Sequence, residues 1–412
     1  MSVAKIIFFV ADFFMLKKNN LIWFLSLLLI NFFCLSLNIF GDENLNKGDI
    51  NALGAVLMDF KTGRVLWEKN LNKKLAMAST TKIMTAILTL EKKDLDLDDE
   101  VVISRNVLSV PKVKLNLIPG EKIKLKYLLL ALMLESSNDA AVAIAEYISG
   151  SVDKFCDLMT EKAGEIGAFN TSFKTPNGLD HEEHYSTAYD MAIIARYALK
   201  NNKFLELINT PSASFSSDKK SYVVNNKNRL LREFDGANGI KTGFTGKAGH
   251  CFVGAAKRND MQLISVVLGS GWGAKGKEAK WSDTKKILDY GFENYEYKKI
   301  VNKNAFAGNI KINHAREKEL NLNYEQDLIL PMNKQEEKNL CIKIKVPEIL
   351  EAPVKKNDVV GIANVFINNK CVSKINLLAD KSIERHDLKT VMRKVFYSWA
   401  NMTEGLEIYF LK

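Results

Sequence analysis

The 412-residue sequence is poor in cysteine and histidine, and this scarcity excludes several kinds of site. Five cysteines are dispersed along the chain: Cys34, Cys156, Cys251, Cys341 and Cys371. Such spacing does not indicate a disulfide scaffold, and the absence of a Cys-x-x-Cys pair argues against a thiolate zinc site. His181 and His184 have two residues between them, whereas zinc proteases place three between their histidines. We therefore expect no metal site and interpret residues 181–184 as a solvated loop.

Glycine and proline are also scarce, with 23 and 7 residues, which excludes a collagen-like or low-complexity chain. Apolar residues make up 47% and charged residues 26%, as in ordinary globular proteins, so predominant disorder is excluded. The net charge of +10 favours anionic surroundings, such as nucleic acid, acidic lipid or an acidic polymer. Because Lys and Arg are scattered and no zinc-finger or RNA-binding signature occurs, we expect no nucleic-acid partner.

The N-terminal region has the pattern of an export signal. Leu21–Phe40 is a run of 20 uncharged residues preceded by Lys17 and Lys18. A basic stretch followed by an apolar one is typical of a secretory signal, although this run is also long enough to span a bilayer. We therefore interpret residues 1–41 as a signal peptide or N-terminal anchor, with the residues before Met15 as an extension, and expect an exported protein.

The C-terminal region predicts an amphipathic helix over residues 384–402. Its apolar positions recur at helical spacing: Leu388, Val391, Met392, Val395, Phe396 and Trp399. Lys389, Arg393 and Lys394 lie elsewhere on the same helix. We favour a helix that rests on an anionic membrane surface over one that packs on its own domain, because basic residues and tryptophan suit that interface.

Between the ends, the pattern predicts two domains. Mixed helices and short-turn, antiparallel strands indicate an α+β domain over residues 45–297. Short alternating stretches indicate a small β-rich domain over residues 301–380.

Ser79 and Lys82 place an alcohol and an amine three residues apart at the start of an apolar helix, where they share a face. A serine needs a base to become a nucleophile, and a lysine with a depressed pKa can supply one. The helix N-terminus adds N–H groups near a developing oxyanion. Ser-x-x-Lys recurs by chance elsewhere in the chain, so this pair alone is a weak signal.

Two further motifs follow in order. Ser136-x-Asn138 lies in a short polar joint between two predicted helices, and Lys241-Thr242-Gly243 lies on a predicted strand. On that strand Lys241 and Gly243 face one way, and the glycine lets a substrate backbone approach closely. The earlier copy, Lys61-Thr62-Gly63, is interpreted as a hairpin turn without a catalytic role. The ordered trio is far more specific than any single motif.

With this trio the chain resembles the low-molecular-weight penicillin-binding proteins that act as D-alanyl-D-alanine carboxypeptidases, and one stretch, residues 280–284, is most similar to the sporulation-type members. Further similar segments are Ala76–Ala86, Thr175–Asp180, Tyr185–Ala188, Gly239–Gly249 and Glu351–Val354. The resemblance covers about residues 50–400 and implies an α+β transpeptidase domain of the penicillin-binding-protein and β-lactamase type, with an antiparallel sheet and helices. A small β-rich domain and a C-terminal amphipathic helix would follow.

The resemblance also implies roles for the motif residues. Ser79 would be the acylated nucleophile, Lys82 the general base and Ser136 a proton relay. The substrate would be bound by Asn138, Lys241, Thr242, Gly243 and the backbone N–H of Phe244, which would complete the oxyanion hole with that of Ser79. Where many relatives use an arginine to hold the terminal carboxylate, this chain offers Lys280.

We therefore predict an exported serine carboxypeptidase at the outer face of the bacterial cytoplasmic membrane. It would remove the terminal D-alanine from peptidoglycan stem pentapeptides, bind β-lactams as inhibitors, and need no metal or cofactor. The alternatives are a D,D-endopeptidase on cross-linked stems, a serine β-lactamase and a non-catalytic wall-binding protein. The β-lactamase is less favoured because no Glu-x-x-Leu-Asn segment lies between Ser136 and Lys241. A dinucleotide-binding Gly-x-Gly-x-x-Ala match at residues 269–274 is interpreted as a loop.

Overall fold

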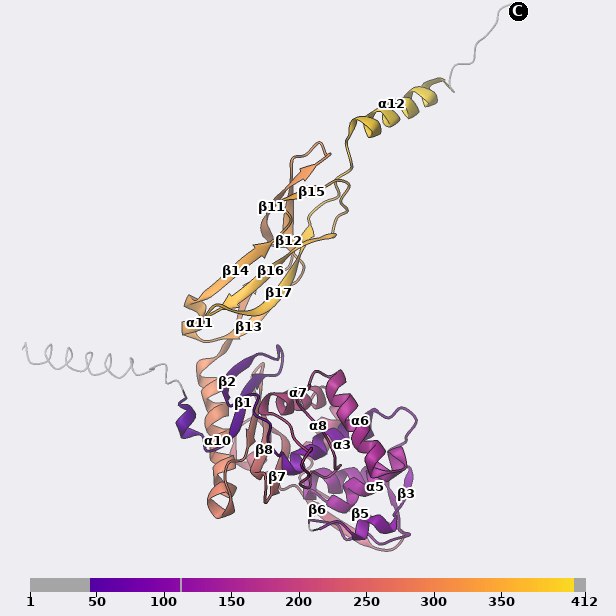
Figure 1. The fold of residues 1–412 in the computed structure, drawn as a ribbon, viewed down its shortest axis with the longest axis vertical. Coiled ribbons are helices and arrows are strands. Elements are labelled where there is room, and N and C mark those ends of the chain that lie inside the picture. The colour runs from indigo at the N-terminus through magenta and orange to yellow at the C-terminus, as the bar shows by residue number, and fades with distance from the viewer. Residues whose placement is uncertain (1–44, 112, 404–412) are drawn as a thin grey trace, which may run out of the picture. The chain divides into compact units, whose positions relative to one another are not determined.

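The computed structural model describes residues 45–111 and 113–403 (Figure 1). The predicted signal or anchor over residues 1–41 lies outside these residues. Two hydrophobic cores are present, one formed by residues between Val56 and Leu268 and the other by residues between Val301 and Ile383. The predicted order of a mixed α+β region, a β-rich region and a C-terminal helix is thus confirmed.

The first region is built on a five-stranded sheet in which all neighbours are antiparallel. The strands, in spatial order, are β2 (Val65–Lys69), β1 (Gly54–Asp59), β9 (Met261–Leu268), β8 (Gly249–Arg258) and β7 (Ala237–Thr245). The Gly-x-Gly-x-x-Ala match at residues 269–274 follows β9. Because β9 is antiparallel to both of its neighbours, this segment is not part of a βαβ unit. β7 is an edge strand, so one side of its backbone is free of sheet partners.

The two faces of this sheet bury different side chains, as alternation along a strand requires. Val56 joins the large helical core, whereas Leu57 points the other way, toward α10 (Gly273–Asn294). A Cβ at Gly291 of α10 would lie 2.6 Å from Leu263 and 2.7 Å from Leu57, so glycine permits this close packing. The sheet is therefore enclosed between α10 and the helical core (Figure 1).

Several helices begin at side-chain caps, which satisfy N–H groups that would otherwise lack partners. Thr187, for example, accepts a hydrogen bond from the N–H of Asp190 at the start of α7. The helical elements are η1 (Lys47–Asp49), η2 (Ala78–Thr81), α3 (Lys82–Glu91), η3 (Arg105–Leu108), α4 (Leu125–Leu130), the π-helical η4 (Ala131–Glu135), α5 (Asn138–Ser149), α6 (Val152–Glu165), α7 (Ala188–Ala198), α8 (Asn202–Asn209) and α9 (Leu230–Glu233). Two ribbons accompany them, β3 (Glu100–Val102) with β4 (Lys122–Lys124) and β5 (Ser212–Ser216) with β6 (Ser221–Asn225).

The second region contains a six-stranded sheet, in which only the β11–β15 pair is parallel. Its strands in spatial order are β14 (Leu340–Lys345), β16 (Val359–Ile367), β17 (Lys370–Ala379), β12 (Glu319–Tyr324), β11 (Phe306–Asn313) and β15 (Ile349–Glu351). A ribbon of β10 (Glu296–Val301) and β13 (Leu328–Met332) leads into it. Alternate residues such as Leu320 and Leu322 are buried, as expected for a sheet with one face on a core.

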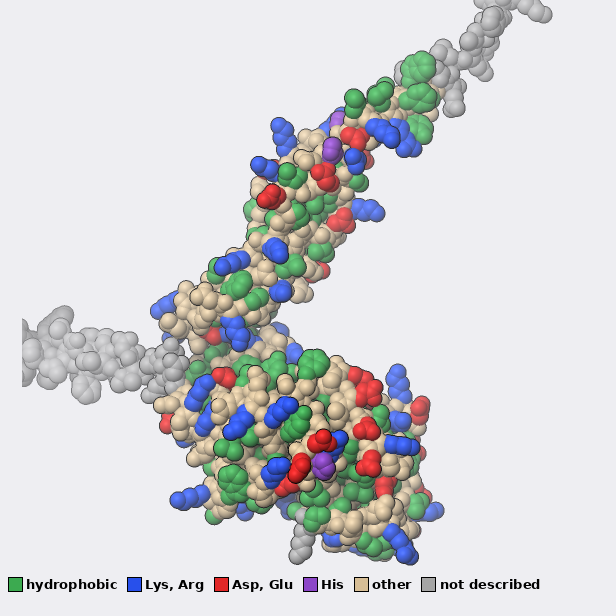
Figure 2. Space-filling view, in the orientation of Figure 1, with side chains coloured by type: hydrophobic (Ala, Val, Ile, Leu, Met, Phe, Trp, Pro, Cys, Tyr) green, Lys and Arg blue, Asp and Glu red, His purple; other side chains and the backbone are tan. Residues whose placement is uncertain are grey.

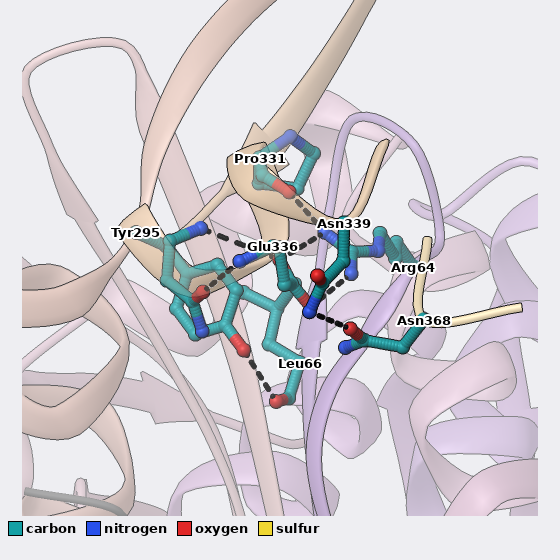
Figure 3. A network of polar contacts seen from close by, with 8 residues as sticks. Arg64, Leu66, Tyr295, Pro331, Glu336, Asn339 and Asn368 are labelled. Carbon is teal, nitrogen blue, oxygen red and sulfur yellow. Dashed lines mark hydrogen bonds and ion pairs between the residues drawn. The ribbon is translucent and has the colours of Figure 1, made fainter. Parts of the chain in front are cut away.

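Polar contacts join the two regions (Figure 3). The guanidinium of Arg64, next to β2, pairs with the carboxylate of Glu336 and also donates to the carbonyl of Pro331. Each side chain of this ion pair is only 11% exposed. Nearby, the Tyr295 hydroxyl donates to the carbonyl of Leu66 over 2.9 Å. Glu336 lies in α11 (Lys334–Lys338), whose capping box orients it.

The last described element is α12 (Leu388–Thr403), as the C-terminal pattern predicts. Its exposed apolar residues are Leu388, Met392, Val395, Phe396, Tyr397 and Trp399. Figure 2 shows hydrophobic side chains gathered on this helix, with Lys and Arg beside them. Within residues 45–111 and 113–403, no helix is both long and apolar enough to span a membrane.

Candidate active site

Ser79 and Lys82 meet on a tight turn at the start of α3. Ser79 lies in the 3-10 turn η2, and the α-helix begins only at Lys82, one turn later than the sequence predicts. Because side chains at positions i and i+3 eclipse one another in a 3-10 turn, Lys82 Nζ lies 3.0 Å from Ser79 Oγ. The hydroxyl of Thr80 holds the turn by donating to the Met77 carbonyl over 2.7 Å.

The Lys82 amine is fully buried and has two further partners. It donates to Oδ1 of Asn138 over 2.8 Å and to the carbonyl oxygen of Asn177 over 2.6 Å. Burial, followed by the nearby charge of Lys241, holds the pKa of Lys82 well below its ordinary value, although Asp139 opposes the shift. A neutral amine that donates to Asn138 and Asn177 has its lone pair left to accept the Ser79 proton. This geometry would let the buried amine act as a general base for the serine.

Gly243 of β7 packs directly against the turn that carries Ser79. A Cβ at residue 243 would lie 2.9 Å from Ser79 N and 3.0 Å from the Ala78 Cβ, closer than real Cβ contacts allow. Any larger residue would therefore push the strand and the turn apart. The predicted Lys-Thr-Gly strand is confirmed as part of β7, and its glycine is explained by this approach.

Two lysines are buried, and the charge of one of them, Lys280, affects the pKa of the other, Lys241. Lys241 is 2% exposed and Lys280 is 7% exposed. Burial and then the charge of Lys280 lower the pKa of Lys241 to about 7. Burial and then the charge of Lys277 lower the pKa of Lys280 to about 8. The carbonyl of Thr242 accepts a hydrogen bond of 2.9 Å from Lys241 Nζ. Such a pair is suited to an anionic group, which would stabilise both ammonium ions.

Of the Ser-x-Asn motif, the structure brings Asn138 rather than Ser136 to Lys82. Ser136 adopts a left-handed conformation, with φ of 68°, between η4 and α5. Ser136 is partly buried, and its hydroxyl has no hydrogen-bond partner within the described part of the chain. Phe244, at the end of β7, is half exposed, and its ring centroid lies 4.3 Å from that of His250.

Sequence reasoning missed two contributors. The carbonyl of Asn177 contacts Lys82, and a backbone carbonyl leaves no residue signature, although residues 175–180 do fall in a segment that resembles the family. The interpretation of residues 181–184 as a solvated loop is wrong for His184, which is 3% exposed and hydrogen-bonded to Thr81. His181 is exposed, as that interpretation requires.

Comparisons with known proteins agree with this geometry. Residues 42–271 match the family described as D-alanyl-D-alanine carboxypeptidase, and residues 295–385 match the penicillin-binding protein 5, C-terminal domain. The D-alanyl-D-alanine carboxypeptidase DacF of Bacillus subtilis is 34% identical over 355 residues, which cover 85% of this chain and 90% of the relative. DacC of Escherichia coli is 30% identical over 359 residues, covering 83% and 87%.

Solved structures are similar over nearly the same span. Penicillin-binding protein 5 of Haemophilus influenzae aligns with a TM-score of 0.70 at 27% identity, covering 83% of this chain and all of that one. The carboxypeptidase DacD of Francisella tularensis aligns with a TM-score of 0.69 at 29% identity, covering 84% and 96%. The predicted fold class and the serine-peptidase class are thus confirmed. The chain belongs to the D-alanyl-D-alanine carboxypeptidase family.

Proposed function

We propose that Ser79 is the nucleophile through which this carboxypeptidase removes the terminal D-alanine of peptidoglycan stem pentapeptides. Ser79 Oγ attacks the carbonyl carbon of the last peptide bond while its proton passes to Lys82 Nζ. The C–N bond then breaks, the leaving amine takes a proton, and an ester on Ser79 remains until water hydrolyses it. The observation that carries this proposal is the 3.0 Å contact between Oγ and a fully buried amine.

Ser136 and Asn138, in the polar joint before α5, take part in the same acylation step. Asn138 orients the Lys82 amine through its Oδ1. Its NH2 group donates one hydrogen bond to the Pro111 carbonyl over 3.2 Å, and its second N–H holds the peptide backbone of the stem. The Ser136 hydroxyl has no hydrogen-bond partner among the described residues and no contact with Lys82 there, and it relays a proton between Lys82 and the leaving amine once bound substrate lies between them.

The substrate's terminal carboxylate is held by the buried cations. Lys241 and Lys280 supply positive charge, and the Thr242 hydroxyl supplies a hydrogen bond. The stem backbone pairs with the open edge of β7, and Gly243 keeps that strand close to Ser79. The oxyanion that forms during attack accepts hydrogen bonds from the backbone N–H groups of Ser79 and Phe244.

The assay is release of D-alanine from a stem pentapeptide, with a cross-linked stem dimer as a second substrate. Release from the pentapeptide, with no release by Ser79→Ala, is the expected result. Faster cleavage of the dimer than of the pentapeptide would replace the carboxypeptidase by the endopeptidase alternative, which the comparisons do not favour. A sporulation role stays a prediction.

We also infer that the enzyme acts outside the cytoplasm and lies on an anionic membrane through α12. The exposed apolar residues of this helix, with its lysines and arginine, support an interfacial position. Phe396→Asp should weaken sedimentation of a chain lacking residues 1–41 with anionic vesicles. Phe306→Asp is a matched control, because Phe306 is equally exposed (64% against 66%) but lies on β11. Equal sedimentation of the two variants would contradict the inference.

A further inference from the structure

His184 lies next to the turn from Ala78 to Lys82, which carries Ser79. It is at the end of a loop that begins at Lys174. Its imidazole is almost fully buried and forms a T-shaped pair with the ring of Phe173, with ring centroids 5.8 Å apart. The backbone N–H of Lys174 donates to Nδ1 over 3.0 Å, so the histidine joins the two ends of the loop. Between those ends the loop presents the Asn177 carbonyl to Lys82.

The hydrogen bonds define the protonation state of this ring. Because Nδ1 accepts the Lys174 N–H, a neutral imidazole must carry its proton on Nε2. Nε2 lies 2.9 Å from the Thr81 hydroxyl and therefore donates to it. The Thr81 hydroxyl in turn donates to the carbonyl of Ala78 over 2.8 Å. Every donor and acceptor in this buried chain is then satisfied. Burial lowers the pKa of His184 to about 4, which is consistent with the neutral form.

This chain of hydrogen bonds ends at the carbonyl of Ala78, a residue whose backbone conformation is unfavourable. Ala78 has a φ of +49°, a left-handed conformation that non-glycine residues rarely adopt. A Cβ at Gly178 would lie only 1.9 Å from the Ala78 carbonyl oxygen and 2.8 Å from the Thr81 hydroxyl oxygen, so the loop packs closely against the same two groups. Ala78 immediately precedes Ser79, and its carbonyl direction sets the path of the turn.

We propose that His184 is a positioning residue for acylation: through Thr81 it holds the turn from Ala78 to Lys82 in the geometry that aligns Ser79 Oγ with Lys82 Nζ. This inference rests on the proposed roles of Ser79 and Lys82. His184 is too deeply buried to touch the substrate, and it acts only through the Thr81 hydroxyl and the loop that carries Asn177.

The first test measures the second-order rate constant for acylation of the full-length chain by a fluorescent penicillin. The amount of adduct formed at completion counts the active molecules, so the rate refers to folded protein alone. His184→Phe retains a ring but loses both hydrogen bonds, and the rate constant should fall about ten- to hundredfold, as expected when a buried hydroxyl loses its donor. His184→Gln retains an N–H donor and should stay within about threefold of the wild type. His181→Phe, on the exposed part of the same loop, should leave the rate unchanged.

The second test asks whether His184 acts through Thr81. Thr81→Val retains the shape but removes the hydroxyl, and it should slow acylation about as much as His184→Phe, whereas Thr81→Ser should restore it. The double variant should be no slower than the slower single variant, because both interrupt one chain of hydrogen bonds. These Thr81 variants decide the question even where His184→Phe does not fold.

Two results would overturn the inference. One is a wild-type acylation rate per active molecule in Thr81→Val or His184→Phe, with only the melting temperature lowered, since His184 would then be structural. The other is additive slowing in the double variant. Failure of the proposed function is distinguishable, because it would appear as acylation of Ser79→Ala whatever the His184 variants do.

Discussion

The tripeptide Lys-Thr-Gly occurs twice in this chain, and its two copies have different structural roles. At Lys61-Thr62-Gly63 it forms the hairpin turn between β1 and β2. The buried carboxylate of Asp59 accepts hydrogen bonds from the Thr62 N–H over 2.7 Å and from the Thr62 hydroxyl over 2.5 Å. Gly63 is needed there for its backbone, since its φ is +74°. At Gly243, which has no positive φ, glycine is needed because Ser79 lies too close for a Cβ.

The two lysines differ in burial and therefore in chemistry. Lys61 is exposed, with its ammonium 5.1 Å above the Tyr297 ring centroid. Lys241 is almost fully buried, and its pKa is lowered to about 7. The tripeptide therefore has no function of its own. The second copy differs because it lies on an edge strand that packs against the turn of Ser79.

Replacing the glycine of each tripeptide copy by alanine should give the largest difference between the two copies. Gly243→Ala should lower the acylation rate constant by more than about a hundredfold, because the strand and the Ser79 turn must move apart. Gly63→Ala should leave that rate unchanged and lower the free energy of unfolding by about 1 kcal/mol, the cost of its left-handed backbone. Penicillin acylation and urea unfolding measure the two effects. Loss of acylation in Gly63→Ala would remove the distinction.

Removing each ammonium group should give the next largest difference. Lys241→Met should lower kcat/KM for the pentapeptide about thirtyfold or more, since a buried carboxylate–ammonium contact with substrate is lost. Lys61→Met should leave kcat/KM unchanged, because its exposed charge only lies over Tyr297. Steady-state kinetics of D-alanine release compare the two. Equal losses would show that long-range charge, rather than position, controls the reaction.

The smallest expected effect is a pH dependence of KM, which follows from the lowered pKa of the buried Lys280. With a pKa of about 8, this lysine loses its proton as the pH rises from 7 to 9, so KM for the carboxylated substrate should rise. Lys280→Arg keeps its charge at every accessible pH, and its KM profile should be shallower by up to about tenfold at pH 9. Profiles of identical steepness would argue that Lys280 does not contact the carboxylate.

Much of the fold could be predicted because alternating strands and amphipathic helices leave clear patterns. The strand that is predicted to carry Lys241, Thr242 and Gly243 corresponds to β7, and the predicted C-terminal amphipathic helix corresponds to α12. The site was less accessible to sequence reasoning. Thr81 and His184 are 103 residues apart, and no local pattern indicates that they share a hydrogen bond. The Asn177 carbonyl and the 3-10 turn at Ser79 are backbone features, which residue types do not specify.

The role of Ser79 is tested by the intact mass of the full-length protein after incubation with penicillin, measured over time beside Ser79→Ala. We expect one lasting adduct per chain on the wild type and none on the variant. A rapidly lost adduct, with consumption of the antibiotic, would indicate the β-lactamase alternative. An adduct on Ser79→Ala, or none on folded wild-type protein, would contradict the assignment of Ser79 as the nucleophile.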